Sequence, residues 1–434
     1  MKITRPPAEL DTALTAAEMM ALTERFREYD EKYYHYHQLA LRIPDRKTLL
    51  KLWTTLKLTR NARRHPLILA NRTAGFNLTK SILRATSVVD KVTFGPGREP
   101  AADLAASYLV SQMVMEEAIS SSQLEGAATT SRVAQAMLVV GREPRNESES
   151  MIMGNWRLMR YISENSESPL TTDTILAMHR LACRGINDGK YQPGTLRASN
   201  DVYVAEREGE IIHQPPDFRE VKAMLDALCE LAIQLEAEEV HPLIVACILH
   251  FAIGFIHPFH DGNGRTARAL FYHTMIRKGY AVFNYISVSK LLKKAAVKYG
   301  TAYLFTETDD LDLTYFIQYQ CSIVCRAVAE FAEGMEKLQE ERLTLAGYVD
   351  STFELSKPEL DILALALNAP GALLSAASVS ERLAVSDNTA RARLKALAGR
   401  GLLRPHKEGR GTVYEAPASV AVLQKWAGKA RLPG

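Results

Sequence analysis

Apolar residues recur at spacings of three and four along most of this 434-residue chain. The pattern is clear in DLAASYLVSQMVMEEAI, VKAMLDALCELAIQL, PLIVACILHFAIGFI and DLTYFIQYQCSIVCRAVAEF. This spacing places apolar side chains on one face of an α-helix, which must then pack against other helices. The clearest β signal is confined to residues 202–213, where two short β-prone runs flank a charged turn with Gly209. We therefore expect a mainly α protein with one small hairpin.

The charge balance of the chain favours no particular partner. The formal net charge is +3, so any strongly basic surface must be local. The N-terminus has no apolar signal-peptide core, and no run of about eighteen apolar residues, as a membrane-spanning helix needs, occurs. We expect a soluble cytoplasmic protein without a membrane partner, long enough for two or three domains.

The cysteines are odd in number, scattered and without a CxxC pair. Cys321 and Cys325 are four residues apart, a spacing that could suit a metal, but no nearby histidine completes a set of ligands. We interpret the cysteines as buried free thiols in a reducing compartment: Cys183, Cys229, Cys247, Cys321 and Cys325.

Four blocks follow one another along the chain. Residues 1–75 are polar and basic, and we expect a helical region of unknown role in which KLTRNARRH, residues 57–65, forms a solvated helix face. Residues 76–335 form a long helical core, and residues 336–354 form a charged linker. Residues 355–434 have a different pattern and form a last domain.

This last block resembles a winged helix-turn-helix. KPELDILALAL suits a first helix, and SAASVSERLAV suits a second helix that Ser378 or Ser380 caps. After the turn SDN, NTARARLKALAGRGLL suits a basic amphipathic helix, and RPHKEGRGTVYEA suits a two-stranded wing with Gly409 and Gly411 at its tip. Such a domain can bind DNA, dock a protein or form a homodimer, and the sequence leaves these uses open.

The stretch HPFHDGNGRTAR, residues 257–268, lies between two predicted helices. Pro258 keeps the first helix from continuing, and the glycines form a turn before a second helix that Gly279 caps. Free backbone N–H groups at this helix N-terminus can bind an anion. Arg265 and Arg268 share one face of its first turns. Because a cation there is unfavourable by roughly 0.3–1 kcal/mol, we predict that a polyanion such as a triphosphate lies between the arginines and the helix end.

Two further residues complete the chemistry of this stretch. Asp261 would repel a phosphate unless a divalent cation lies between them, and Mg²⁺ takes one or two carboxylates together with phosphate oxygens. His257, if neutral, can act as a general base for an attacking hydroxyl. A glycine turn, a lone histidine or two helical arginines usually have structural roles only, but all of them within twelve residues indicate a site.

The same stretch resembles the Fic family signature, HPFx(D/E)GNGRxxR, with every defining position filled and His260 at the variable position. The resemblance covers roughly residues 105–325. It implies a compact helical bundle with a β-hairpin flap, and transfer of AMP from ATP, with Mg²⁺, to a hydroxyl side chain of a protein. It also implies a base at His257, a Mg²⁺ ligand at Asp261, an anion hole at Gly262, Asn263 and Gly264, phosphate contacts from Arg265, γ-phosphate binding by Arg268, and loop anchors at Pro258 and Phe259.

The resemblance extends to two neighbouring regions. Residues 193–204 resemble the lead-in to the family's flap, whose edge can pair with an extended segment of a target protein; the candidates are Val202, Tyr203 and Val204, and an ordinary surface hairpin is the alternative. Tyr299 and Tyr303 are candidates for an adenine pocket. Two tyrosines packed at helical spacing without a ligand are equally compatible with the sequence.

SSSQLEGAAT, upstream of the core motif, contains a carboxylate at a probable helix end. Glu125 precedes Gly126, and a carboxylate at a helix C-terminus seeks a cation. Arg268 lacks a partner when no ATP is bound. The stretch also resembles the family's inhibitory pattern, (S/T)xxxE(G/N), with Ser121, Glu125 and Gly126. By that resemblance, a helix around 107–126 places Glu125 against Arg268 and blocks productive seating of the γ-phosphate.

The first functional hypothesis is therefore an adenylyltransferase inhibited by Glu125, with an unknown target protein or itself as substrate. A second is a transcription regulator that acts through residues 355–434, and both can hold for one chain. A third keeps the fold but uses another nucleotide donor. In some family members the same glutamate supports removal of AMP, and the sequence does not decide between these roles.

Overall fold

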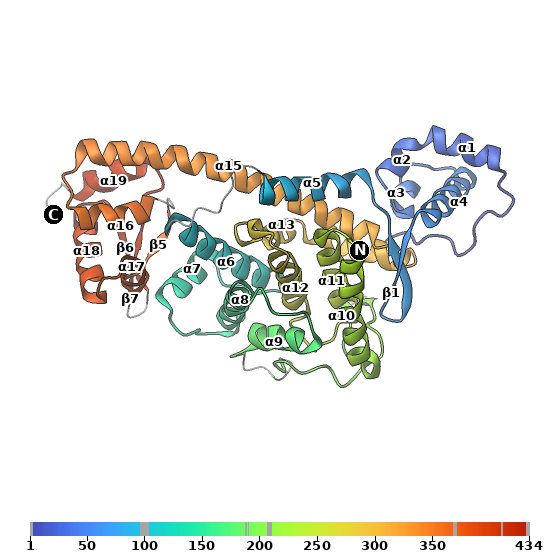
Figure 1. Cartoon of the computed structure of the whole chain (residues 1–434), viewed down its shortest axis with the longest axis horizontal. Coiled ribbons are helices and arrows are strands. Elements are labelled where there is room, and N and C mark those ends of the chain that lie inside the picture. Colours follow the sequence, from blue (N-terminus) through green and yellow to red (C-terminus); the bar gives the residue numbers. More distant parts are fainter. Residues whose placement is uncertain are drawn as a thin grey trace.

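The computed structural model describes residues 3–95, 104–186, 189, 191–205, 211–367, 371–408 and 411–430. It is mainly helical, and three parts follow one another along its longest axis (Figure 1). A small N-terminal part lies at one end, the helical core in the middle and the C-terminal part at the other end. Helix α15, Thr314–Thr352, runs along the core and reaches the C-terminal part.

The N-terminal part surrounds the buried indole of Trp53 with a separate apolar cluster. The solvated face that we expected in residues 57–65 is wrong for two of its cations, because Lys57 and Arg60 are buried. Lys57 pairs with Asp309 of the core. The part consists of α1 Ala16–Arg25, α2 Arg27–Glu31, α3 Tyr36–Ala40, α4 Arg46–Ala62, β1 His65–Leu69 and β2 Arg72–Phe76.

The hairpin β1–β2 was not predicted. Its two-residue turn consists of Ala70 and Asn71, both with positive φ (48° and 60°). A turn of this kind usually carries Asn-Gly or Asp-Gly, so its sequence signal is weak here. The antiparallel pair runs from His65 opposite Phe76 to Leu69 opposite Arg72.

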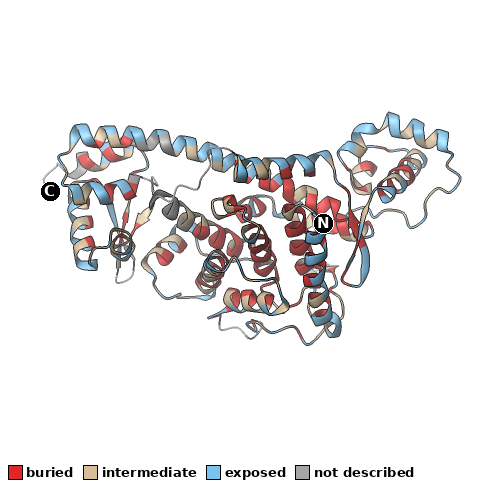
Figure 2. Cartoon of the chain, in the orientation of Figure 1, coloured by how far each residue is buried: buried red, intermediate tan, exposed pale blue. Residues whose placement is uncertain are grey.

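The core is organised around α11, Pro242–Ile256, nearly all of whose residues are buried (Figure 2). A helix that is apolar on all sides must lie in the centre of a bundle. Its antiparallel neighbour α12 begins directly after the predicted site loop. The other elements of the core are α5 Lys80–Phe94, α6 Leu104–Leu124, α7 Ser131–Val140, α8 Glu147–Glu164, α9 Thr172–Cys183, β3 Val204–Ala205, β4 Ile211–His213, η1 Phe218–Glu220, α10 Val221–Ala237, α12 Asn263–Arg277, η2 Ala281–Asn284, α13 Val288–Lys294 and α14 Ala296–Thr308.

The segment that we predicted as a linker, 336–354, lies almost wholly within α15. Leu345 and Val349 of this helix are buried in the apolar cluster of the C-terminal part. The charges of the segment therefore lie on a continuous helix that joins the two parts.

The C-terminal part contains a three-stranded antiparallel sheet in the order β5-β7-β6. The cap of its second helix is Ser375, not Ser378 or Ser380: its hydroxyl accepts from the Ser378 N–H, and the Ser378 hydroxyl accepts from the Ser375 N–H. Gly411 begins β7, whereas Gly409 lies outside the described residues. The elements are α16 Lys357–Leu367, β5 Leu373–Leu374, α17 Ala376–Leu383, α18 Asp387–Gly399, β6 Arg404–Glu408, β7 Gly411–Glu415 and α19 Val420–Ala430.

All five cysteines are free thiols; four are buried and Cys325 is partly exposed. Among the described helices, none combines the length and the apolar character that a bilayer crossing requires.

Candidate active site

The loop between α11 and α12 makes a sharp reversal that depends on two left-handed residues. His257 ends α11 with φ 50°, and Gly262 begins α12 with φ 81°. The His257 Nδ1 lies 3.2 Å from the Gly254 carbonyl oxygen. With the proton on Nδ1, the lone pair of Nε2 is available. Burial lowers the pKa of His257 to about 4, so its imidazole is neutral near pH 7.

The side chain of Asn263 holds the middle of this loop through hydrogen bonds to the loop's own backbone. The Asn263 amide accepts from the Phe259 N–H at 3.0 Å and donates to the Phe259 carbonyl at 2.8 Å. Phe259 is fully buried, as predicted. The Asn263 side chain is thus occupied with the loop itself, and only its backbone N–H at the start of α12 can contribute to an anion site.

His179 of α9 packs against the loop, and sequence reasoning missed this residue. Its ring stacks on Phe259, with centroids 3.6 Å apart and planes 4° apart. Its Nε2 lies 2.9 Å from the Asp261 carbonyl oxygen, and its Nδ1 accepts from the Gly194 N–H. Burial lowers the pKa of His179 to about 4, which keeps this neutral arrangement.

Arg197 is a second positioning residue that sequence reasoning missed. It is buried, and its Nε donates to the His257 carbonyl oxygen at 2.9 Å. Its own backbone N–H donates to the Pro258 carbonyl. The last carbonyls of α11 carry partial negative charge, which a guanidinium neutralises. In the sequence, a basic residue directly before the predicted flap was the signal that could have identified Arg197.

Arg265 and Arg268 do not converge on one anion. Arg265 is fully buried, and its Nη1 donates to the Ala182 carbonyl of α9 at 2.6 Å. Its Nη2 lies 4.0 Å from the Asp261 carboxylate. The two long side chains leave α12 towards different helices, and the predicted phosphate contact of Arg265 stays a prediction. Arg265 fastens α9 to the loop.

Arg268 turns the other way, towards α6. It is 2% exposed, and it donates from Nε to the Ser121 hydroxyl at 2.8 Å and from Nη2 to the Ser121 carbonyl at 3.0 Å. Its Nη1 lies 2.8 Å from Oε1 of Glu125. The carbonyl and the carboxylate both sit at the negative end of α6, so one guanidinium satisfies both. The predicted contact between Glu125 and Arg268 is present.

The carboxylate of Glu125 also lies over Gly264. A Cβ at Gly264 would collide with Oε1 of Glu125, so only glycine permits this approach. Gly126 follows with φ 97°, a conformation that glycine adopts without strain. The Glu125 carboxylate therefore occupies the space between the start of α12 and Arg268, where we predicted a phosphate.

Asp261 is the carboxylate nearest to this space and is partly exposed at 31%. One of its oxygens accepts from the Gly262 N–H at 2.5 Å. Mg²⁺ prefers oxygen ligands and retains phosphate and water ligands beside one carboxylate, so Asp261 fits such an ion. No group of three or more potential metal-binding side chains occurs among the described residues.

The flap and the two tyrosines flank the loop. Val204 pairs with His213, and Ala205 with Ile211, while residues 206–210 lie outside the described part. Of the flap candidates Val202, Tyr203 and Val204, Tyr203 is the most exposed, at 52%. His213 holds the flap to the core, because its Nε2 lies 2.8 Å from the Phe255 carbonyl oxygen.

Tyr299 and Tyr303 lie side by side on α14 against α11. The Tyr299 hydroxyl is 2.7 Å from Nε2 of His250, and Tyr303 packs against the helix backbone at Gly254. Arg268 and Glu125 act electrostatically on Tyr299. The tyrosines therefore border the site, but their hydroxyls make contacts within the protein.

The inhibitory helix of the prediction, α6, is anchored by a buried glutamate. Glu117 is 2% exposed and accepts from the hydroxyls of Tyr272 at 2.9 Å and Ser287 at 2.8 Å, and from the Ser289 N–H at 3.0 Å. These donors come from α12, α13 and the segment before α13. In the sequence, the signal for this contact was the position of Glu117 within an apolar run.

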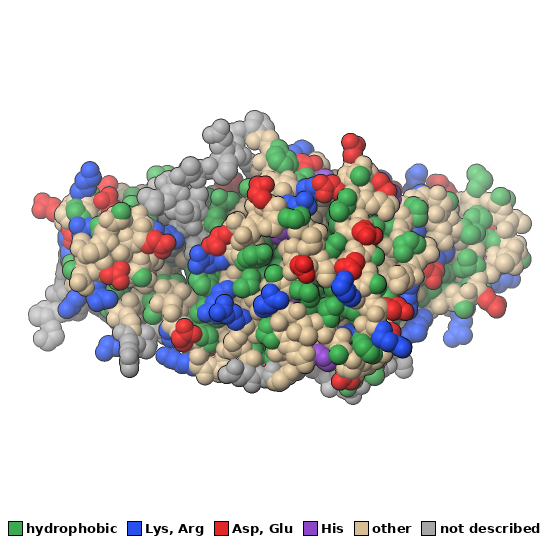
Figure 3. All heavy atoms as spheres, turned by 60° about the horizontal axis from the view of Figure 1, so that its bottom comes forward, with side chains coloured by type: hydrophobic (Ala, Val, Ile, Leu, Met, Phe, Trp, Pro, Cys, Tyr) green, Lys and Arg blue, Asp and Glu red, His purple; other side chains and the backbone are tan. Residues whose placement is uncertain are grey.

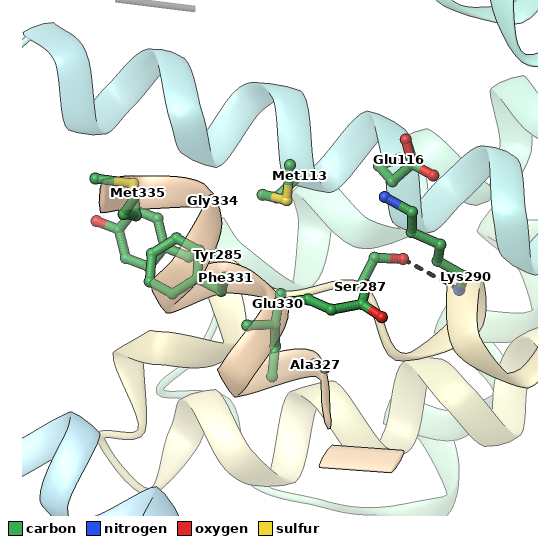
Figure 4. A pocket seen from close by; sticks show the side chains of 11 residues that line it. Met113, Glu116, Tyr285, Ser287, Lys290, Ala327, Glu330, Phe331, Gly334 and Met335 are labelled. Carbon is green, nitrogen blue, oxygen red and sulfur yellow. Dashed lines mark hydrogen bonds between the residues drawn. The ribbon is translucent and has the colours of Figure 1, made fainter. Parts of the chain in front are cut away.

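A cavity of about 240 Å³ lies on α6 away from the loop (Figure 4). Met113 and Glu116 of α6 face Tyr285, Phe331 and Met335 across it. It contains none of the predicted site residues. The catalytic loop and this cavity are thus separate features.

Comparison with known proteins agrees with this geometry. Residues 169–275 match the model of the Fic/DOC family. Protein adenylyltransferase Fic from Nematostella vectensis is 26% identical over 193 residues, which is 42% of either chain. The protein of the same name from Drosophila mojavensis is 30% identical over 156 residues, 36% of this chain and 29% of the relative. The chain thus spans less than half the length of these curated relatives.

A solved structure of part of Fic-1 from C. elegans has the same fold. Its TM-score is 0.51 at 19% identity, and the match covers 74% of this chain and 87% of that chain. The mainly helical bundle that the sequence indicated is thereby confirmed.

Proposed function

The chain carries a Fic domain, and we propose that it is a protein adenylyltransferase that transfers AMP from ATP to a hydroxyl side chain of a protein. The observation that carries this proposal is the position of the Glu125 carboxylate between Gly264 and Arg268. A buried guanidinium that holds one anion beside a helix N-terminus is suited to phosphate. The adenylyltransferase names of the relatives support the same activity.

In the proposed reaction, the neutral His257 accepts the proton of the attacking hydroxyl at Nε2. The hydroxyl oxygen forms a bond to the α-phosphorus of ATP, and the bond to pyrophosphate breaks. The backbone N–H groups of Gly262, Asn263 and Gly264 would stabilise the negative charge, and that of Gly262 would first have to leave the Asp261 carboxylate. Asp261 would hold Mg²⁺, which would neutralise charge on the phosphates.

We further propose that Glu125 inhibits this reaction. Its carboxylate and a terminal phosphate would both need Arg268, and two anions in one low-dielectric site repel each other. Productive ATP binding then requires Glu125 to leave. The segment Val202, Tyr203 and Val204, which leads into β3, would bind the target by strand pairing.

The test is incubation of the whole chain with α-labelled ATP and Mg²⁺, followed by detection of label on protein. We expect label with Glu125→Gly, little with wild type and none with Glu125→Gly/His257→Ala. Glu116→Gly is the matched control, because Glu116 lies on the same helix but does not contact Arg268. Label from γ-labelled ATP would show phosphate transfer instead. Absence of label from a folded Glu125→Gly variant with either nucleotide would refute the proposal.

We propose a second candidate function for residues 355–434, where three helices, α16 to α18, followed by the β6–β7 pair support the predicted winged helix-turn-helix. A groove of about 930 Å³ runs between α17, α18 and the β6–β7 pair. Arg391, Lys395 and Lys407 line it together with a single acid, Asp387. This excess of cations favours binding of a nucleic-acid backbone, and the binding should weaken steeply with salt.

A further inference from the structure

The catalytic core contacts the C-terminal part through α7, which begins six residues after Glu125. Arg132 of α7 places its Nη2 3.2 Å from Nε2 of His406 and 3.3 Å from Oε2 of Glu415. These partners lie on β6 and β7, the strands of the predicted wing. Figure 1 shows α7 beside both α6 and the small sheet. One short helix therefore touches both functional parts.

The charged part of this contact is weak enough to be exchanged. The Arg132 side chain is 67% exposed, and exposed ion pairs contribute little to stability. His406 and Glu415 also pair with each other, with 2.6 Å between Nε2 and Oε2, so they keep a partner when Arg132 leaves. Loss of the contact leaves no buried charge behind.

The segment between Glu125 and α7 is short and bonded back to α6. Gln123 donates to the Thr129 carbonyl at 2.7 Å, and the Ala127 N–H donates to the Ser122 carbonyl. A displacement of α7 consequently pulls on the turn that carries Glu125. Gly126, with φ 97°, provides a pivot directly after the carboxylate.

The end of α7 also borders the basic groove. Val140, its last residue, lines the groove together with Arg391 and Lys395 of α18 and Lys407 of β6. The two α18 cations are four residues apart and share one helix face. The face shown in Figure 3 carries both charge signs, whereas the groove is lined by three cations and one acid.

We propose that duplex nucleic acid bound in this groove displaces α7 from β6 and β7 and thereby loosens Glu125 from Arg268. A duplex that receives α18 in its major groove also covers the wing and meets α7 at Val140. The proposal rests on both proposed functions, transfer by the core and nucleic-acid binding by the C-terminal part. The groove and the site at Arg268 would then be coupled, so a ligand bound at one must change binding at the other.

The experiment uses the full chain and a fluorescein-labelled duplex of random sequence at low salt. Affinity is measured by fluorescence anisotropy, and transfer by label from α-labelled ATP with and without the duplex. We expect Arg132→Ala to bind the duplex about 1.4- to fivefold more tightly, the range that an exposed ion pair supplies, and to raise labelling similarly. Arg160→Ala is the control, since Arg160 forms an exposed pair with Glu164 on α8 away from the contact.

The duplex itself should raise labelling of wild type but not of Glu125→Gly, which is already released. Arg391→Ala should abolish both duplex binding and its effect on labelling. Unchanged affinity and labelling in Arg132→Ala would overturn the coupling, and so would a lack of duplex binding, which would leave protein docking as the use of the groove. If Glu125→Gly takes no label, the transferase proposal fails, whereas the affinity of Arg132→Ala still tests the coupling.

Discussion

Residues 57–65 and 257–268 both contain several cations, and both bury an arginine almost completely. Arg60 is 1% exposed, and its partners are Asp30 of α2, the Tyr34 carbonyl between α2 and α3, and the Tyr315 hydroxyl of α15. Arg268 is 2% exposed, but its charged partner is Glu125, on a turn after α6, with a side chain 29% exposed. Burial alone does not separate a structural arginine from a functional one. What differs is the position of the charged partner, because Asp30 lies within α2 and Glu125 lies on the turn that follows α6.

The comparison predicts a large difference in stability between two matched substitutions. Arg60→Met should lower the free energy of unfolding by about 3 kcal/mol, because it removes a buried guanidinium from the Tyr34 carbonyl, the Tyr315 hydroxyl and Asp30, although Asp30 keeps Arg63 as a donor. Arg268→Met should cost about 1–2 kcal/mol, since Glu125 can turn into solvent. Urea denaturation followed by circular dichroism measures both. Equal losses would break the distinction between fixed and exchangeable partners.

The pH dependence of transfer sharpens the role of the loop. Burial lowers the pKa of His257 to about 4, so the imidazole takes up a proton only below that pH. Labelling by Glu125→Gly should therefore stay nearly constant from pH 8 to about 5 and then fall. A base with the ordinary pKa of about 6.5 would lose about tenfold by pH 5.5. A fall centred near pH 6.5 would contradict the buried neutral base.

The same pH range needs a stability control. The folded pKa values of His179 and His257 are both about 4, below the ordinary value for histidine. The unfolded chain therefore binds protons first as the pH falls, and stability decreases between about pH 6.5 and 4. Circular dichroism at each pH separates this loss from protonation of the base.

The sequence predicted the loop well because its constraints are local. The glycine turn before α12 follows from residue types within one window, whereas the buried Phe259 and the contact of Glu125 with Arg268 follow from the resemblance to the family's signature and inhibitory pattern. The sequence did not place Lys57 or Arg60, because their partners lie about 250 residues away in the chain. Charge runs alone do not reveal such long-range pairing.

The two arginines of the loop show the same limit at closer range. Helical spacing put Arg265 and Arg268 on one face, yet a guanidinium reaches several ångströms and the packing of α9 and α6 decides its direction. His179 and Arg197 were missed for the same reason, since each meets the loop only after the bundle has formed.

Removing the charge of Glu125, the exchangeable partner of Arg268, should change labelling by an intermediate amount. Glu125→Gln keeps the size of the side chain but removes its charge, and a charge-assisted hydrogen bond is roughly twice as strong as a neutral one. Labelling should rise about tenfold over wild type and remain below that of Glu125→Gly. The same α-labelled ATP assay measures it. Labelling equal to wild type would mean that shape, not charge, keeps the site closed.

The smallest effect concerns the other partner of Arg268. Ser121→Ala removes the hydroxyl that accepts from Nε of Arg268, while the Ser121 carbonyl remains as an acceptor. The loss of one such hydrogen bond is about 0.5–1 kcal/mol, which shifts the closed state by about two- to fivefold. Ser120→Ala on the same helix is the control, because its hydroxyl donates to Glu116 and does not contact Arg268. If Ser121→Ala lowers labelling instead, Ser121 holds Arg268 in the orientation that phosphate needs, and the inhibitory contact then consists of Glu125 alone.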